Sequence, residues 1–131
     1  MSAVAITIQA LLAASGVTAL TGTHVYPIKA PQNATTSVVV HLIHEADDLM
    51  LTGPHAEYYR ARVQIDCRAD TATKVMALGE AVKAALGNIV RRSFASGKAT
   101  FFKEGSEAMQ AIDEPALYRR HMDYKVFWRK T

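Results

Sequence analysis

The stretch "RARVQIDCRAD", residues 60–70, alternates apolar and polar residues one by one. In an extended strand, successive side chains point to opposite faces of the sheet. The alternation therefore predicts a strand with one buried face and one polar face. The apolar face consists of Tyr59, Ala61, Val63, Ile65 and Cys67, and the polar face consists of Arg60, Arg62, Gln64, Asp66 and Arg68.

The one cysteine of the chain lies in this strand, between an aspartate and an arginine. A reactive thiol needs a cationic neighbour or a base that lowers its pKa, and Arg68 follows Cys67 directly. Because the alternation places these two side chains on opposite faces, we interpret Cys67 as a small buried hydrophobe without reactivity. A single cysteine also allows no internal disulfide and fits a reducing compartment.

Length and composition narrow the class of protein. A chain of 131 residues is expected to form one domain, residues 1–131, and its 50% apolar content excludes a disordered tail. No apolar run approaches the roughly 20 residues that span a bilayer, so we expect a soluble protein without membrane contact. The net charge of +3 permits nucleic acid as a partner without implying it.

The N-terminal third predicts a helix followed by irregular chain. Apolar residues at helical spacing over residues 2–14, with Ser2 as a possible cap, predict a helix that Gly16 ends. Several breakers then exclude a long helix before residue 36 and leave at most a short strand over residues 23–26. The β-branched run that follows predicts a buried strand over residues 38–44, with Val38, Val40 and Leu42 on one face.

A loop is predicted over residues 45–57, where three acidic residues precede a Gly-Pro pair. This loop contains three consecutive apolar residues, Leu49, Met50 and Leu51. Exposed apolar patches often mark protein contacts, so these residues are candidates for an interface. The alternative is that the loop folds back onto its own sheet.

The second half of the chain predicts one helix and further strands. Asp70 is a possible N-cap for a helix that ends at Gly87, with Val75, Leu78 and Val82 among its core positions. Residues 89–106 are interpreted as a loop with a turn at Gly97 that leads into an extended segment over residues 99–103. A bend or bulge is expected at Gly105, and residues 107–112 and 117–129 are expected to be extended. The predicted fold is α+β, with two helices packed on a mostly antiparallel sheet of four or more strands.

No pattern in the sequence carries catalysis or binds a metal or cofactor. On a regular strand, the spacing of His41 and His44 places their rings on opposite faces, so that they could not hold one ion. The chain lacks a phosphate-binding glycine loop and a Gly-x-Ser-x-Gly nucleophile sequence. We therefore expect a non-enzymatic protein without metal or cofactor.

Four blocks of sequence resemble the tail completion, or tail terminator, proteins of long-tailed bacteriophages and gene transfer agents. The most specific feature is a Gly-Pro loop followed by an arginine-containing strand that ends in Val63, Gln64, Ile65, Asp66 and Cys67. Residues 89–107 contribute nothing to the resemblance. The blocks are "LLAASGVTALTGTHVYP", "APQNATTSVVVHLI", "LTGPHAEYYRARVQIDCRADTATKVMALGEAVKAAL" and "DEPALYRRHMDYKVFW".

The resemblance implies a structural virion protein that caps the tail tube, ends its polymerisation and joins the tail to the head or neck. The expected partners are further copies in a ring, expected to be a hexamer, together with the tail tube protein and the head-tail connector. DNA would pass through the lumen without sequence-specific binding. The protein would be assembled in the host cytoplasm and located at the head-proximal end of the tail. Candidate interface or lumen residues are Arg60, Arg62, Arg68, Arg119, Leu49, Met50 and Leu51.

Three other interpretations remain open from the sequence. A neck, head-completion or minor tail protein of the same particle would have a domain of similar size. A small ligand-binding or enzymatic α+β domain would need convergent polar groups in a pocket. A basic nucleic-acid-binding module would bind free DNA with a steep dependence on salt.

Overall fold

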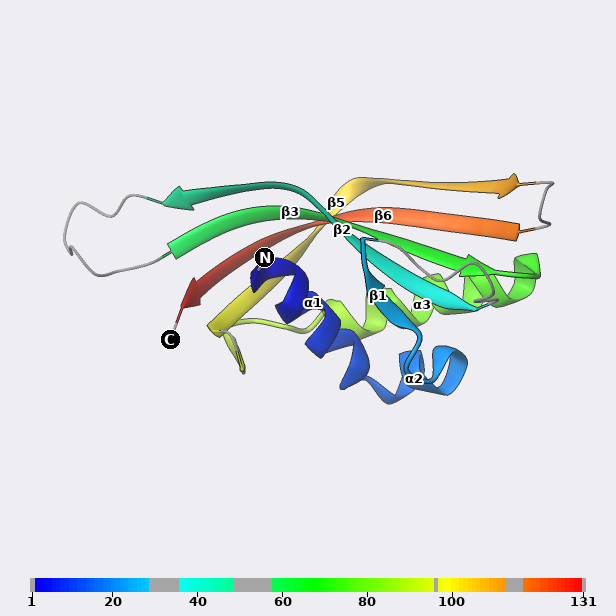
Figure 1. The fold of residues 1–131 in the computed structure, drawn as a ribbon, viewed down its shortest axis with the longest axis horizontal. Helices are drawn as coiled ribbons and strands as arrows, with labels where there is room; N and C mark the ends of the chain where they lie inside the picture. The colour runs from blue at the N-terminus through cyan, green and yellow to red at the C-terminus, as the bar shows by residue number, and fades with distance from the viewer. Residues whose placement is uncertain (1, 29–35, 49–57, 96, 113–116, 131) are drawn as a thin grey trace.

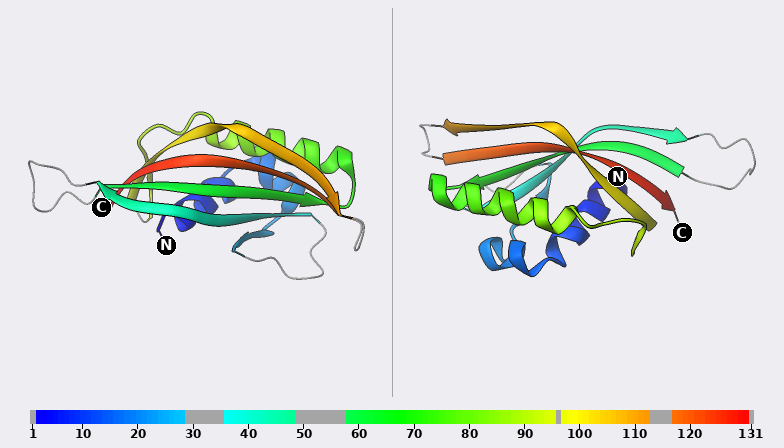
Figure 2. Two further views of the ribbon diagram at one scale, coloured as in Figure 1. Left: turned by 90° about the horizontal axis from the view of Figure 1, so that it is seen from above. Right: turned by 180° about the vertical axis from the view of Figure 1, so that it is seen from behind.

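The computed structural model of the chain describes residues 2–28, 36–48, 58–95, 97–112 and 117–130. Three helices cover one face of a six-stranded sheet with the order β1-β2-β3-β6-β5-β4, and the other face carries no helix (Figures 1 and 2). The α+β class is therefore confirmed, with three described helices in place of the two expected. The elements are α1 Ser2–Leu12, α2 Ser15–Thr21, β1 Val25–Pro27, β2 Ser37–Asp48, β3 Tyr58–Ala69, α3 Ala72–Leu86, β4 Arg92–Phe94, β5 Gly97–Ile112 and β6 Leu117–Lys130.

The sheet is mixed. The pairings of β2 with β3, β3 with β6, β6 with β5 and β5 with β4 are antiparallel, whereas the short β1 joins β2 in parallel. A three-residue strand has too short a pattern to reveal its direction, and this is why the sequence indicated only its existence. The sheet is strongly twisted, and its strands fan apart toward both ends (Figure 1).

The alternation of β3 sets the position of the core. Val63, Ile65 and Cys67 are completely buried, and their neighbours on β6, Met122 and Tyr124, are buried on the same face. Burial of each aliphatic side chain of this size contributes roughly 1.5–3 kcal/mol. The predicted core positions of α3 are confirmed, since Val75, Leu78, Val82 and Leu86 are all completely buried.

The N-terminal helix is shorter than predicted. It ends at Leu12, and a second helix follows in which Gly16 lies in the first turn, so Gly16 does not end a helix. Ala14 between them has an extended backbone, and the two helices are bent by 85°. No single described helix is long and apolar enough to cross a membrane; α1 and α2 reach that length and composition only as this bent pair.

Strand β2 continues beyond its predicted end. Glu45 to Asp48, predicted to begin a loop, pair with Ala61 to Tyr58 of β3, so that prediction is wrong. A bulge between Leu42 and His44 shifts the alternation by one residue.

The bulge also corrects the prediction for the two histidines of this strand. His41 lies opposite Gln64 and His44 lies opposite Arg62, so both are on the polar face of β3. The expectation of opposite faces assumed a regular strand and is wrong.

In the second half, two details differ from the prediction and one confirms it. Thr71, and not Asp70, caps α3, because its Oγ1 accepts a hydrogen bond from the Lys74 amide at 3.2 Å. Residues 92–94 and 97–98, predicted to lie in a loop, form β4 and the start of β5. The expected bulge near Gly105 is confirmed by the register shift between Lys103 and Glu107.

Candidate assembly surface

The arginines that the sequence singled out lie on the face of the sheet opposite to the buried core. This is the helix-free face, which is toward the viewer in Figure 2, left. Arg60, Arg62 and Arg68 of β3 lie on this face, and register places Arg119 of β6 opposite Arg68. We call the paired polar side chains of these two strands the polar ladder. It comprises Arg62, Gln64, Asp66 and Arg68 on β3 and Arg119, His121 and Asp123 on β6.

Asp66 joins two of the candidate arginines. Its carboxylate accepts hydrogen bonds from Arg119 Nη2 at 2.8 Å and from Arg68 Nε at 3.0 Å. The side chain of Asp66 is 0% exposed, whereas those of Arg68 and Arg119 are 28% and 25% exposed. The two guanidinium groups therefore cover the carboxylate and compensate its charge.

The rest of the polar ladder is also internally paired. Arg62 donates to Asp123 Oδ2 from Nη2 at 2.8 Å and from Nε at 3.2 Å. The Gln64 amide nitrogen lies 3.1 Å from Nδ1 of His121. Arg60 is exposed on the same face, opposite Ala46 of β2 and Phe127 of β6. Arg62, Arg68 and Arg119 thus each have a carboxylate partner on the same face.

Two exposed aromatic side chains extend the helix-free face beyond the polar ladder. Phe102 and Phe127 are 53% and 38% exposed, and their rings meet edge to face at 5.5 Å. Exposed aromatic residues are typical of protein contact surfaces. No pattern in the sequence indicated this pair, because the two residues come together only through the register of β5 with β6.

A buried arginine on the opposite face was also missed. Arg120 lies opposite Cys67 and is only 5% exposed. Its Nη1 donates to the Met76 carbonyl at 3.0 Å, and its Nη2 donates to Glu80 and Glu107 at 3.1 Å each. The hydrogen bond from Arg120 lowers the pKa of both carboxylates. The contacts of Arg120 connect α3 with β5 and β6, so this side chain has a structural role.

Cys67 is buried in the core. Burial, reinforced by the neighbouring Asp66 carboxylate, raises the pKa of Cys67 to about 12, so the thiol stays protonated at neutral pH. Among the described residues, no group of three or more His, Cys, Asp or Glu side chains could hold a metal ion. Leu49, Met50 and Leu51 lie outside the described residues.

Both margins of the sheet carry stretches without a strand partner among the described residues. β1 pairs only with Val38 to Val40 of β2, and β4 pairs only with Gly97 to Ala99 of β5. The outer sides of residues 41–48 and 102–112 therefore face no described strand. Unpaired strand edges can be completed by another chain.

Comparisons with protein families and with solved structures relate this chain to known proteins. A family model described as "Tail completion protein gp17" matches residues 6–88, which is more than half of the chain. Among solved structures, a chain in the "Virion of native gene transfer agent (GTA) particle" matches with a TM-score of 0.68 and 19% identity, covering 94% of this chain and 91% of that chain. At this identity the likeness shows a shared fold. No curated protein sequence matches.

Proposed function

This chain belongs to the tail completion protein gp17 family, and we propose that it caps the tail tube, ends tube polymerisation and forms the ring that joins tail to head or neck. The observation that carries the proposal is the family match over residues 6–88, which includes the whole of β3. That the chain is a structural protein of a phage tail follows from the family itself.

The open margins of the sheet support assembly into a ring. A ring forms when one surface of a subunit meets a different surface of its neighbour and the rotation closes. The unpaired outer sides of β2 and β5 are two such different surfaces on opposite margins of one sheet. We propose a hexamer of single-domain subunits, residues 1–131, that is assembled in the host cytoplasm and located at the head-proximal end of the tail.

The polar ladder suits a surface past which DNA moves. Tight binding to DNA needs cationic side chains that neutralise phosphates and release the counterions of the DNA. In the polar ladder, Arg62, Arg68 and Arg119 already have carboxylate partners in the fold. We propose that this face lines the lumen or a subunit interface, that it lets DNA pass without sequence-specific binding, and that the protein acts without catalysis.

Binding to the tail tube protein is the test of this proposal. We expect the purified chain to form a complex with tail tubes whose mass corresponds to one ring on each tube, at one of its ends. Tubes assembled in its presence should also be shorter than tubes assembled without it. The measurement is mass photometry and electron microscopy of tubes with and without the chain. A chain that never engages the tube, or that binds only a portal-side protein, would overturn the proposal in favour of a neck protein.

We further propose that Arg60 and the segment Leu49, Met50 and Leu51 contact neighbouring particle proteins. Arg60→Glu, and separately Leu49→Ser with Leu51→Ser, are expected to lower the yield of completed tails about tenfold or more, since each replaces a contact group with one of opposite character. The matched control is Lys74→Glu on the exposed face of α3, which should leave completion unchanged. Unchanged yields for both test variants, with the thermal midpoint preserved, would exclude these residues as contacts.

A further inference from the structure

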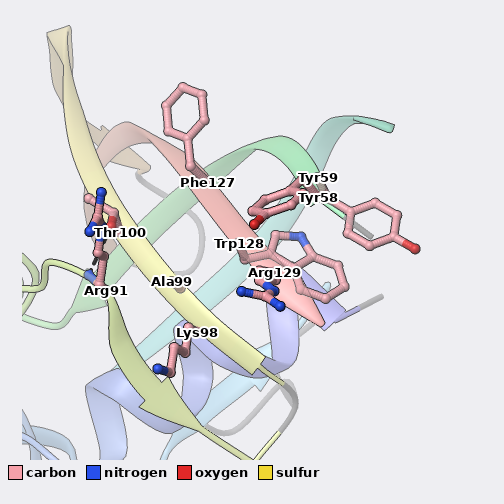
Figure 3. Close-up of a pocket in the computed structure, with 9 residues that line it drawn as sticks. All are labelled: Tyr58, Tyr59, Arg91, Lys98, Ala99, Thr100, Phe127, Trp128 and Arg129. Atoms are coloured by element: carbon pink, nitrogen blue, oxygen red, sulfur yellow. Dashed lines mark hydrogen bonds between the residues drawn. The ribbon is translucent and has the colours of Figure 1, made fainter. Parts of the chain in front are cut away.

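A pocket with several cations lies at one end of the sheet (Figure 3). Its volume is about 480 Å³, and none of its lining residues is acidic. Arg129 stacks over the Tyr58 ring at 5.5 Å, and the side chains of Arg91 and Lys98 form no ion pair within the described residues. We call this site the basic pocket. It is lined by Tyr58, Tyr59, Arg91, Lys98, Ala99, Thr100, Phe127, Trp128 and Arg129.

The acidic end of β2 lies in the same cross-strand rows, at the opposite margin of the sheet. One row of the register runs from Asp48 of β2 through Tyr58 and Arg129 to Lys98 of β5. The next row runs from Asp47 of β2 through Tyr59, Trp128 and Ala99 to Arg92 of β4. Each row thus begins at an acidic residue and ends on the side of the sheet that carries the cations.

This arrangement gives the two margins complementary charge. When a second copy is placed beside the first in the same orientation, the acidic end of its β2 comes to the margin that carries Arg92 and the basic pocket. Such a contact joins two different surfaces and repeats around a ring. Complementary charge of this kind fixes the register and orientation of a contact.

We infer that the basic pocket receives the acidic end of β2, with Asp47 and Asp48, from a second copy of this chain. The inference rests on the proposed ring and names the two surfaces that meet in it. The aromatic walls provide apolar area, and Arg91, Lys98 and Arg129 provide the counterions for the carboxylates.

Cysteine cross-linking in assembled tails tests the contact. Asp48→Cys and Lys98→Cys are combined in one chain, in which the buried Cys67 does not compete. Within one chain these positions are separated by three strand spacings, about 14 Å, which is too far for a disulfide that needs its Cα atoms within about 7 Å. A disulfide between them therefore has to join two copies. We expect oxidation to give a ladder of covalent multimers that ends at a closed ring.

Controls separate the inference from the proposed function. The pair Asp48→Cys with Met109→Cys, at the far end of β5, should give no ladder, and an equal ladder from it would overturn the inference. Completed tails without the 48–98 ladder would also overturn it and leave the ring proposal intact. Failure of the unsubstituted chain to engage the tube would overturn both.

A charge exchange provides a second measurement that needs no cysteine. Lys98→Asp is expected to lower the yield of completed tails about tenfold, and adding Asp48→Lys should restore most of it. Equal loss in the single and the exchanged variants would contradict the contact.

Discussion

Replacing Gly79 by alanine is expected to lower the free energy of unfolding by about 2 kcal/mol, even though alanine is the better helix former. A Cβ atom at Gly79 would lie 2.5 Å from both Cδ and Nη1 of Arg120. Arg120 has little room to yield, because it is 5% exposed and is held by the Met76 carbonyl and by Glu107. Alanine stabilises the helix by about 1 kcal/mol relative to glycine. Displacing the Arg120 guanidinium destabilises the fold by more than that.

The matched test is a double-mutant cycle with Arg120→Ala, followed by urea unfolding. Without the Arg120 side chain, the space beside residue 79 opens, and Gly79→Ala should become stabilising by about 1 kcal/mol. Ala84→Gly on the exposed side of the same helix is the control for propensity alone and should cost about 1 kcal/mol. Stabilisation by Gly79→Ala in the unsubstituted chain would show that Arg120 moves aside at little cost.

The elements that the sequence predicted well are those with a long and regular period. In β3 the alternation runs unbroken over ten residues, and in α3 the apolar residues recur over four turns, so each pattern indicated both the element and its buried face. Residues 15–21 have no comparable stripe, and their helix is held by packing against α3 that no local pattern reveals. Glu45 to Asp48 looked like a loop because they are acidic, yet pairing with β3 keeps them extended.

The candidate surface could be predicted only in part for a related reason. Alternation placed Arg60, Arg62 and Arg68 on the polar face, since that step needs only the period of one strand. The partners of these arginines depend on the register between strands that are far apart in the chain, as for Arg62 with Asp123. The same holds for Arg120, whose burial requires the missing side chain at Gly79.

Combining Arg68→Gln with Arg119→Gln is expected to lower the free energy of unfolding by about 3 kcal/mol. The reason is that the fully buried Asp66 carboxylate would lose both of its guanidinium partners. Each single substitution should cost clearly less than half of this, because the remaining arginine still compensates the carboxylate. Arg62→Gln is the control, since the Arg62 side chain is 47% exposed and its ion pair with Asp123 should contribute less than about 1 kcal/mol.

Adding Asp66→Asn to the double variant separates the two roles that these arginines can have. The neutral amide needs no counterion, so the triple variant should recover most of the lost stability in chemical denaturation. If the triple variant folds well and still fails to complete tails, Arg68 or Arg119 also contacts a neighbouring subunit. If it completes tails normally, both arginines serve to cover Asp66. In that case, the residues of this face that contact other proteins are Arg60 and the exposed phenylalanines. A double variant as stable as the unsubstituted chain would show that Asp66 does not depend on these two arginines.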